Sequence, residues 1–589
     1  MRCSVKANRK SKLVQSAGLS ALVLMGQSLQ TQAASFQLGE VDAQLDSSLS
    51  FGAIWSTQSP DQDLIGAING GDGVAAVGDD GRLNFRAGDM VSNVFKGVHD
   101  LDVRWRDSGL FVRGNYWYDF ELKDRSQRLK DVSDDGRLQA AQSAGSQILD
   151  AFVYHNYDAA GMSGSARLGK QVVSWGESTF IPNSINSINP VNLTALRRPG
   201  AELKEALIPV NMAFVSHSFN DAISVEAFYQ LNWREIVVDN CGTFFSGTDL
   251  IARGCDRAVI AGGGDIDPAT QVFIPRIDDR DPSDSGQFGV ALKWYAEQLN
   301  STEFGLYAMN YHSRAPSLSS ISVDGSAPVP GDPGFAVSSR YFVDYAEDIE
   351  LYGLSFQTFL NSTGTSIGGE ISHRPDMPMQ INGNDLVGAT MVPPEARATS
   401  ANPLYVSGYA PSGAGEEITG YVMKPFTQAQ VTAVHIFGGL LGSSRLALIG
   451  EVGVSHIGDL GSTNGEDLRF GRDTVFGNGP LVDGSCGGNS KCTTDGFYTD
   501  TSWGYRIRGN FEYPNVVAGV SLKPSMSFSH DVSGYGPTFN EGSKAVGIGL
   551  AANYKFQYNA SINYTDFFGG DFNTRSDRDF VSVSVGFDF

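Results

Sequence analysis

Residues 171–209 bring together the charged and aromatic side chains that could bind a small molecule. Basic groups attract an anionic head group and apolar neighbours shelter a hydrocarbon portion, so the mixture suits an amphiphile. The alternative is that the arginines pair with acidic residues and only hold the segment in place. The candidate contact residues in this segment are Trp175, Glu177, Arg197, Arg198, Glu202 and Lys204.

The same segment is too apolar for a free loop and lacks the alternation of a strand. We expect it to fold inward, into the interior of a wide β-barrel, as a constriction or plug. Pro199 can open a short helix with Leu203 and Leu207 on one face. The apolar groups expected to be sheltered are Trp175, Phe180, Ile181, Ile185, Ile188, Leu193, Leu196, Leu203 and Leu207, and the acids expected to face the basic residues are Asp100, Asp102, Asp119 and Glu226.

We predict no enzyme and no cofactor. None of the eight histidines stands in a readable nucleophile-and-acid arrangement, and there is no zinc-spaced cluster or phosphate loop. The acidic runs at 265–267 and 278–284 could hold Ca²⁺, because clustered carboxylates suit hard cations. Neither has the spacing of an EF-hand loop, so solvated turns are expected there.

Four cysteines remain once an export signal is removed, and they form two local pairs in polar, Gly-rich segments. In an exported chain an even number of loop cysteines predicts disulfides. A metal site is the alternative, but the two pairs lie far apart and have no neighbouring histidine. The predicted bonds join Cys241 to Cys255 and Cys486 to Cys492.

The elements that must position these groups are strands of period two. In residues 580–589, Val581, Val583 and Val585 share one face while serines occupy the other. About ten residues at a 45° tilt cross a bilayer, although the pattern alone also fits a strand of a soluble sandwich. Further expected strands lie near 41–55, 93–105, 108–120, 148–157, 163–173, 209–219, 222–238, 286–297, 302–313, 349–360, 363–373, 427–439, 445–458, 501–513, 518–532, 546–556 and 560–568.

These strands predict an all-β fold: one transmembrane antiparallel barrel of about 18 strands, within a range of 16 to 20. Short connections would be periplasmic turns and long ones extracellular loops. Arginine opposite an aromatic face needs a wet lumen behind the sheet. The inward-facing wall residues expected to contact substrate or a partner are Arg113, Arg506 and Arg508.

Residues 1–34 have the basic start, apolar run and small-residue end of a cleaved signal peptide, which leaves 35–589 for the barrel. Residues 1–33 contain five of the 43 basic residues and none of the 65 acidic ones, so the formal charge would change from −22 to −27. A strongly acidic chain argues against nucleic-acid binding. We therefore expect the Gram-negative outer membrane, with its lipids and the barrel-assembly machinery as partners.

Three runs within the inward segment, at 171–178, 188–191 and 196–206, resemble the signature of a proteobacterial family of outer-membrane proteins of unknown function. The resemblance covers essentially the whole mature chain. It implies the outer-membrane barrel of an envelope-spanning route for lipids or other hydrophobic molecules. Its implied partners are a periplasmic carrier protein and an inner-membrane transporter of the RND type. A general diffusion porin and a surface receptor or adhesin with long loops remain the alternatives.

Overall fold

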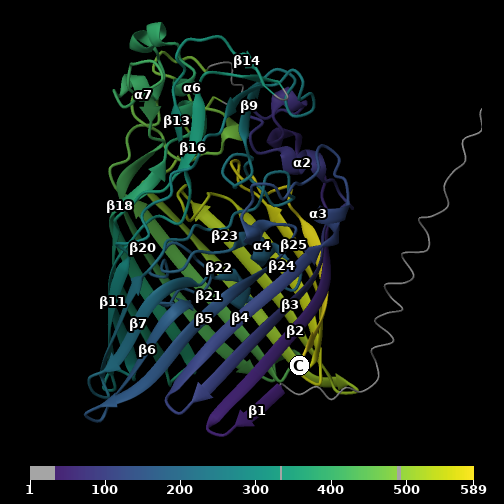
Figure 1. Ribbon diagram of the computed structural model, residues 1–589, viewed down its shortest axis with the longest axis vertical. Helices are drawn as coiled ribbons and strands as arrows, with labels where there is room; N and C mark the ends of the chain where they lie inside the picture. The colour runs from purple at the N-terminus through teal and green to yellow at the C-terminus, as the bar shows by residue number, and fades with distance from the viewer. Residues whose placement is uncertain (1–33, 332–333, 487–491) are drawn as a thin grey trace, which may run out of the picture.

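Eighteen antiparallel strands pair side by side and close into a barrel in the computed structural model, which describes residues 34–331, 334–486 and 492–589 (Figure 1). Closure leaves no free sheet edge, so the wall satisfies its own backbone polar groups in lipid. The wall strands are β2 (Val41–Ser56), β3 (Met90–Trp105), β4 (Ser108–Asp119), β5 (Ala144–Ala159), β6 (Met162–Gln171), β7 (Val210–Ser218), β8 (Ile223–Gln230), β11 (Phe288–Ala296), β12 (Thr302–Tyr311), β17 (Ile349–Leu360), β18 (Thr365–Gln380), β20 (Tyr421–Gly438), β21 (Arg445–Ile457), β22 (Thr501–Val517), β23 (Val520–Ser533), β24 (Lys544–Tyr554), β25 (Tyr558–Phe568) and β26 (Phe580–Asp588).

The barrel closes where β26 pairs with β2. Phe51 lies opposite Val585 in this ladder, and the backbone N–H of Ser47 donates to the carbonyl of Phe589 at 2.7 Å. A short strand, β1 (Ala34–Leu38), folds back on the start of β2. The alternating pattern of residues 580–589 thus does form a wall strand, as predicted.

The two faces of the wall differ in polarity. Ile548 on β24 and Met526 on β23 point outward and are more than half exposed, whereas Gly547 and Ser527 pair on the inner face. Outward apolar groups of this kind line the strands and form a surface suited to lipid. None of the described helices is long and apolar enough to cross a membrane. Of the predicted signal peptide, residues 1–33 lie outside the described residues, and Ala34 begins β1.

Connections alternate in length around the barrel. Short turns such as Arg106 to Asp107 join strands at one end, and long loops join them at the other. At the long-loop end the described loops carry two small sheets and four short α-helices, drawn above the barrel in Figure 1. These elements are β9 (Arg257–Ala261), β10 (Val272–Pro275), β14 (Val329–Pro330), β15 (Phe335–Ala336), β13 (Ser317–Ile321), β16 (Arg340–Asp344), β19 (Glu417–Ile418), α2 (Asp80–Asn84), α3 (Phe120–Asp124), α6 (Gly383–Thr390) and α7 (Pro403–Val406).

One expected strand was too long. β8 ends at Gln230 and does not continue to 238, because Trp233 leaves the wall and packs on Tyr345 in a long loop, with ring centres 4.6 Å apart. Both predicted cysteine pairings are present, with Cα–Cα distances of 6.2 Å for Cys241–Cys255 and 5.6 Å for Cys486–Cys492. Each bond closes a stretch within one long loop.

Candidate functional site: an inward segment and the passage beside it

Residues 172–209, between β6 and β7, lie inside the barrel and contain two short helices, α4 (Leu193–Arg197) and α5 (Leu203–Ala206). At one side Pro199 lies against Gly52 on β2. At the other side the segment bonds to Glu370 on β18, which is ten strands from β2 in one direction and eight in the other. Contacts with nearly opposite walls mean that the segment spans the lumen, as the sequence predicted.

Two buried glutamates hold the first part of the segment by its backbone. Glu451 on β21 accepts hydrogen bonds from the N–H groups of Thr179, Phe180 and Ile181 at 2.8, 2.6 and 2.8 Å. Glu370 accepts from the N–H groups of Glu177 and Ser178. Hydrogen bonds to a charged acceptor are stronger than neutral ones, so this turn of the segment is firmly fixed to the wall.

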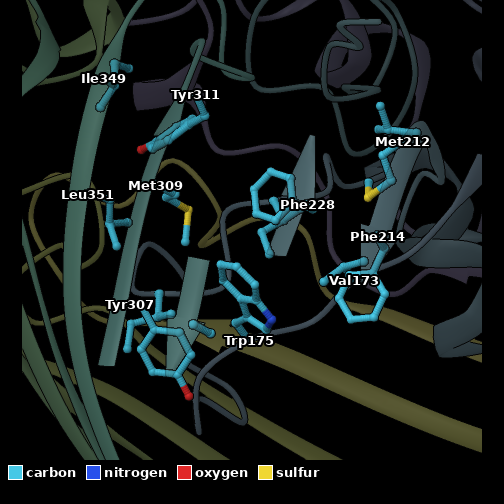
Figure 2. Packing of buried hydrophobic residues seen from close by; sticks show 14 of the residues in the cluster. Val173, Trp175, Met212, Phe214, Phe228, Tyr307, Met309, Tyr311, Ile349 and Leu351 are labelled. Carbon is cyan, nitrogen blue, oxygen red and sulfur yellow. The ribbon is translucent and has the colours of Figure 1, made fainter. Parts of the chain in front are cut away.

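An aromatic cluster anchors the segment next to these glutamates. Trp175 is 2% exposed and packs on Phe228 of β8 and Tyr307 of β12, with ring centres 5.1 and 5.8 Å away (Figure 2). Its indole Nε1 donates to Glu226 Oε2 at 2.7 Å. Trp175 is therefore a structural anchor of the segment and not an exposed substrate contact.

Two buried arginines of the neighbouring wall and loop hold the carbonyl groups of the segment. Arg374 on β18 donates to the carbonyl oxygens of Asn183 and Ser184 at 3.0 and 2.8 Å. Arg314 donates to the carbonyl oxygen of Ile188 at 3.2 Å. Donors and acceptors of the segment's backbone are thus both satisfied by side chains outside the segment.

The basic part of the segment pairs differently from the prediction. Lys204 lies 3.9 Å from Asp100, one of the expected acids, and 3.1 Å from Glu202. Arg197 instead pairs with Asp239 at 3.5 Å. The Arg198 guanidinium lies 4.0 Å from the ring centre of Trp117 and donates to the carbonyl oxygen of Ala140.

The expected helix at Pro199 is also wrong. α4 ends at Arg197, and α5 begins only at Leu203, after Glu202, whose side chain and that of Glu205 form a capping box. Leu203 and Leu196 are 75% and 44% exposed, so they are not sheltered as predicted. Leu196 lines the cavity beside the segment and gives it apolar surface.

The three predicted wall arginines have different surroundings. Arg113 is neutralised by Asp100 at 2.7 Å and Asp150 at 3.2 Å. Arg506 pairs with Asp531 at 2.6 Å. Arg508 is exposed, hydrogen bonds only to Asn510 in the part of the chain that the structure describes, and has no ion-pair partner there. Arg508 alone of the three presents an uncompensated charge.

A cavity of about 390 Å³ separates the inward segment from one side of the wall. Arg197, Arg198, Pro199 and Gly200 line it on the segment side, and Arg508 lines it on the wall side. Most inward residues of the wall there, on β23 to β26, are small or polar: Ser525, Ser527, Gly547, Gly549, Ser561, Asn563 and Ser582. Phe580 on β26, Ile54 on β2 and Phe245 of a long loop add apolar surface. Small side chains keep this side of the lumen open beside the segment.

One string in the sequence, 364–368, has the Gly-x-Ser-x-Gly spacing of a hydrolase elbow. Ser366 lies within β18, directly after a turn, and the chain continues as strand to Gln380. A nucleophile elbow needs a sharp turn from strand into helix, so this serine is a wall residue.

The residues that fix the segment were not found in the sequence. Glu370 and Glu451 are single inward acids within strands, and nothing in their spacing links them to residues 177–181. The sequence offers one hint: Gly368 and Gly369 precede Glu370, and Gly450 precedes Glu451. Glycines in a strand leave room for another backbone to approach the wall.

Distant structural similarity is found to several bacterial outer-membrane proteins. The crystal structure of Acinetobacter baumannii OccAB1 matches with a TM-score of 0.39 and 9% identity over 96% of this chain and 99% of that chain. The A. baumannii channel DcaP matches with a TM-score of 0.35 and 8% identity over 94% and 100%. Pseudomonas aeruginosa OccD3 (OpdP) gives 0.38 and 10% over 95% and 93%.

Comparison of the sequence with curated proteins finds no match. A family model described as "Protein of unknown function (DUF1302)" matches residues 15–589. The match covers the entire barrel, the inward segment and the long loops, and the chain therefore belongs to the DUF1302 family.

Proposed function

We propose that this protein is an outer-membrane channel for amphiphilic molecules that carry an anionic head group. The observation that carries the proposal is the cavity between residues 197–200 and the wall of β23 to β26, with the unpaired Arg508 on its far side. An uncompensated guanidinium attracts carboxylate or phosphate groups, and it is the charge that a passing anion meets.

The apolar part of such a molecule also has a surface to follow. Leu196 lines the cavity next to Arg197 and Arg198, and Leu203 is exposed further along the same segment. Burial of hydrocarbon on these side chains offsets part of the cost of moving the molecule out of its carrier or membrane. A pore for simple ions or sugars has no use for exposed leucines, which is why lipid-like cargo is favoured over a general diffusion porin.

The inward segment acts in this proposal as a fixed constriction. Movement of the segment is restricted by its hydrogen bonds to Glu370 and Glu451 and by the packing of Trp175. Cargo would pass beside the segment, and its size would be limited by the small residues of the facing wall. The channel would serve an envelope-spanning lipid route, receiving or delivering cargo through a periplasmic carrier protein and an RND-type transporter.

Two residues on β24 provide the test. Gly547 lines the cavity on the inner face, whereas Leu550 lies on the outward face, is 40% exposed and is not among the residues that line the cavity. The Gly547→Leu variant should lower single-channel conductance in planar bilayers and slow the transfer of a fluorescent fatty acid across proteoliposomes. Leu550→Ile is the matched control and should change neither.

Two outcomes would contradict the proposal. Equal conductance in Gly547→Leu and the native protein would mean that the passage lies elsewhere. Fast transfer of neutral sugars, without transfer of the fatty acid, would favour the general porin instead.

A further inference from the structure

Two long loops bring a group of acidic residues together at the long-loop end of the barrel. Asp79 and Asp80 stand at the start of α2 (Asp80–Asn84), in the loop between β2 and β3. Asp249 and Asp265 come from the loop between β8 and β11. One carboxylate oxygen from each of Asp79, Asp80 and Asp265 lies within 4.8 Å of the other two.

This cluster is held in place by groups around it. Asp79 is 1% exposed and accepts the N–H of Gly66 at 2.8 Å. The side-chain amide of Asn69 donates to Asp79 at 3.0 Å and to Asp265 at 2.9 Å. A single amide thus sets the separation of two carboxylates from different loops.

Asp80 supplies a second observation, which points to a ligand. This side chain is 1% exposed, and its Oδ1 is buried without a hydrogen-bond partner among the described residues. Oδ1 of Asp249 is also buried without a hydrogen-bond partner among the described residues. Oδ2 of Asp249 accepts the backbone N–H of Asp80 at 3.2 Å. A buried acceptor without a partner destabilises the fold, so native proteins normally fill such a position.

The charge of the cluster is also unbalanced. Four carboxylates are met by Lys130, whose ammonium group pairs with Oδ2 of Asp80 and whose side chain is half exposed. Burial, together with the neighbouring carboxylates, raises the pKa of Asp79 to about 7. Burial likewise raises the pKa of Asp249 to about 6, against the opposing effect of Lys130.

We propose that Asp79, Asp80, Asp249 and Asp265 bind one divalent cation, Ca²⁺ in preference to Mg²⁺, and that the ion fastens the first and fourth long loops together. Carboxylates from flexible loops suit Ca²⁺, which accepts six to eight oxygen ligands in variable geometry. Mg²⁺ demands a stricter octahedron and keeps more of its water. Lys130 competes for the same carboxylates and moves toward solvent when the ion binds.

Titration of Ca²⁺ by isothermal calorimetry tests this inference. The full-length protein, refolded in detergent without lipopolysaccharide, should bind one Ca²⁺ with a Kd of roughly 10⁻⁴–10⁻³ M, as extracellular modules do. Asp80→Asn should weaken binding at least tenfold, because it removes a ligand charge. Lys130→Met should tighten binding severalfold, because it removes the competing cation. Asp267→Asn, an exposed acid two residues from Asp265, is the control and should bind like the native protein.

The opposite signs expected for Asp80→Asn and Lys130→Met separate a lost ligand from a damaged fold. Heat-modifiable migration on gels checks that each barrel is closed. No saturable binding up to roughly 10 mM, ten times the weak end of that range, would overturn the site. So would equal weakening by Asp80→Asn and Asp267→Asn, or weaker binding in Lys130→Met.

Discussion

The backbone N–H of Ile181 donates to Oε2 of Glu451 at 2.8 Å, across 270 positions of sequence. The backbone N–H groups of Thr179 and Phe180 donate to the same carboxylate, and Glu451 is only 2% exposed. Replacing Glu451 with alanine leaves three amides without their charged acceptor, at a cost of about 3 kcal/mol. We expect hydrogen exchange of residues 179–181 to accelerate roughly a hundredfold, since 1.4 kcal/mol is about a factor of ten.

Glu303→Ala is the control for this experiment. Glu303 is an exposed residue of β12 with no hydrogen bond to the inward segment among the described contacts. Equal protection of residues 179–181 in both variants would show that Glu451 does not hold the segment.

The close approach of Pro199 to Gly52 predicts a loss of stability on adding a single methyl group. A Cβ at position 52 would lie 2.7 Å from Cβ of Pro199 and 2.7 Å from the carbonyl oxygen of Val583. Gly52→Ala should lower the free energy of unfolding by about 1–3 kcal/mol, measured by denaturant titration in detergent. At Gly450 a Cβ meets nothing within 4 Å, so Gly450→Ala should stay within about 0.5 kcal/mol of the native protein. Equal losses would argue against the contact with Pro199.

The unpaired charge of Arg508 predicts anion preference in the passage. Arg508→Gln should lower the anion-to-cation permeability ratio roughly fivefold, equivalent to about 1 kcal/mol, the interaction of two unit charges 4 Å apart in water. Reversal potentials in a KCl gradient measure this ratio. Lys555→Gln makes the same charge change in the short turn after β24 and should have little effect. A ratio that changes equally in both variants would reflect net charge alone.

The two disulfides predict different costs of reduction. Cys241–Cys255 closes a stretch of 14 positions and Cys486–Cys492 a stretch of six. By the chain-entropy relation their loss costs about 3 and about 2 kcal/mol of loop stability. Limited proteolysis measures this difference. Cleavage of the loop between β8 and β11 in Cys255→Ser should be faster than cleavage of the loop between β21 and β22 in Cys492→Ser. Loops that resist cleavage equally with and without reductant would contradict this.

The wall of the barrel could be predicted from sequence because each strand shows its own alternation, as at Val581, Val583 and Val585. The end of β8 could not be predicted. Trp233 continues the alternating pattern but packs on Tyr345 in a long loop, and the pattern does not show whether an apolar side chain faces lipid or protein. The inward position of residues 172–209 followed from apolar groups without alternation. The wall residues that bind the segment, such as Glu370 and Glu451, could not be predicted, because closure of the barrel decides which strands face the segment.

The contacts of Pro199 and Gly200 have a consequence for the order of folding events. Pro199 lies against Gly52 on β2, and Gly200 lies beside Ser584 on β26, so the segment touches both strands that join to complete the ring. These contacts tie the inward segment to both partners of the closing strand pair. We therefore expect the segment to settle and the last strand pair to form together, and a misplaced segment to slow completion of the barrel.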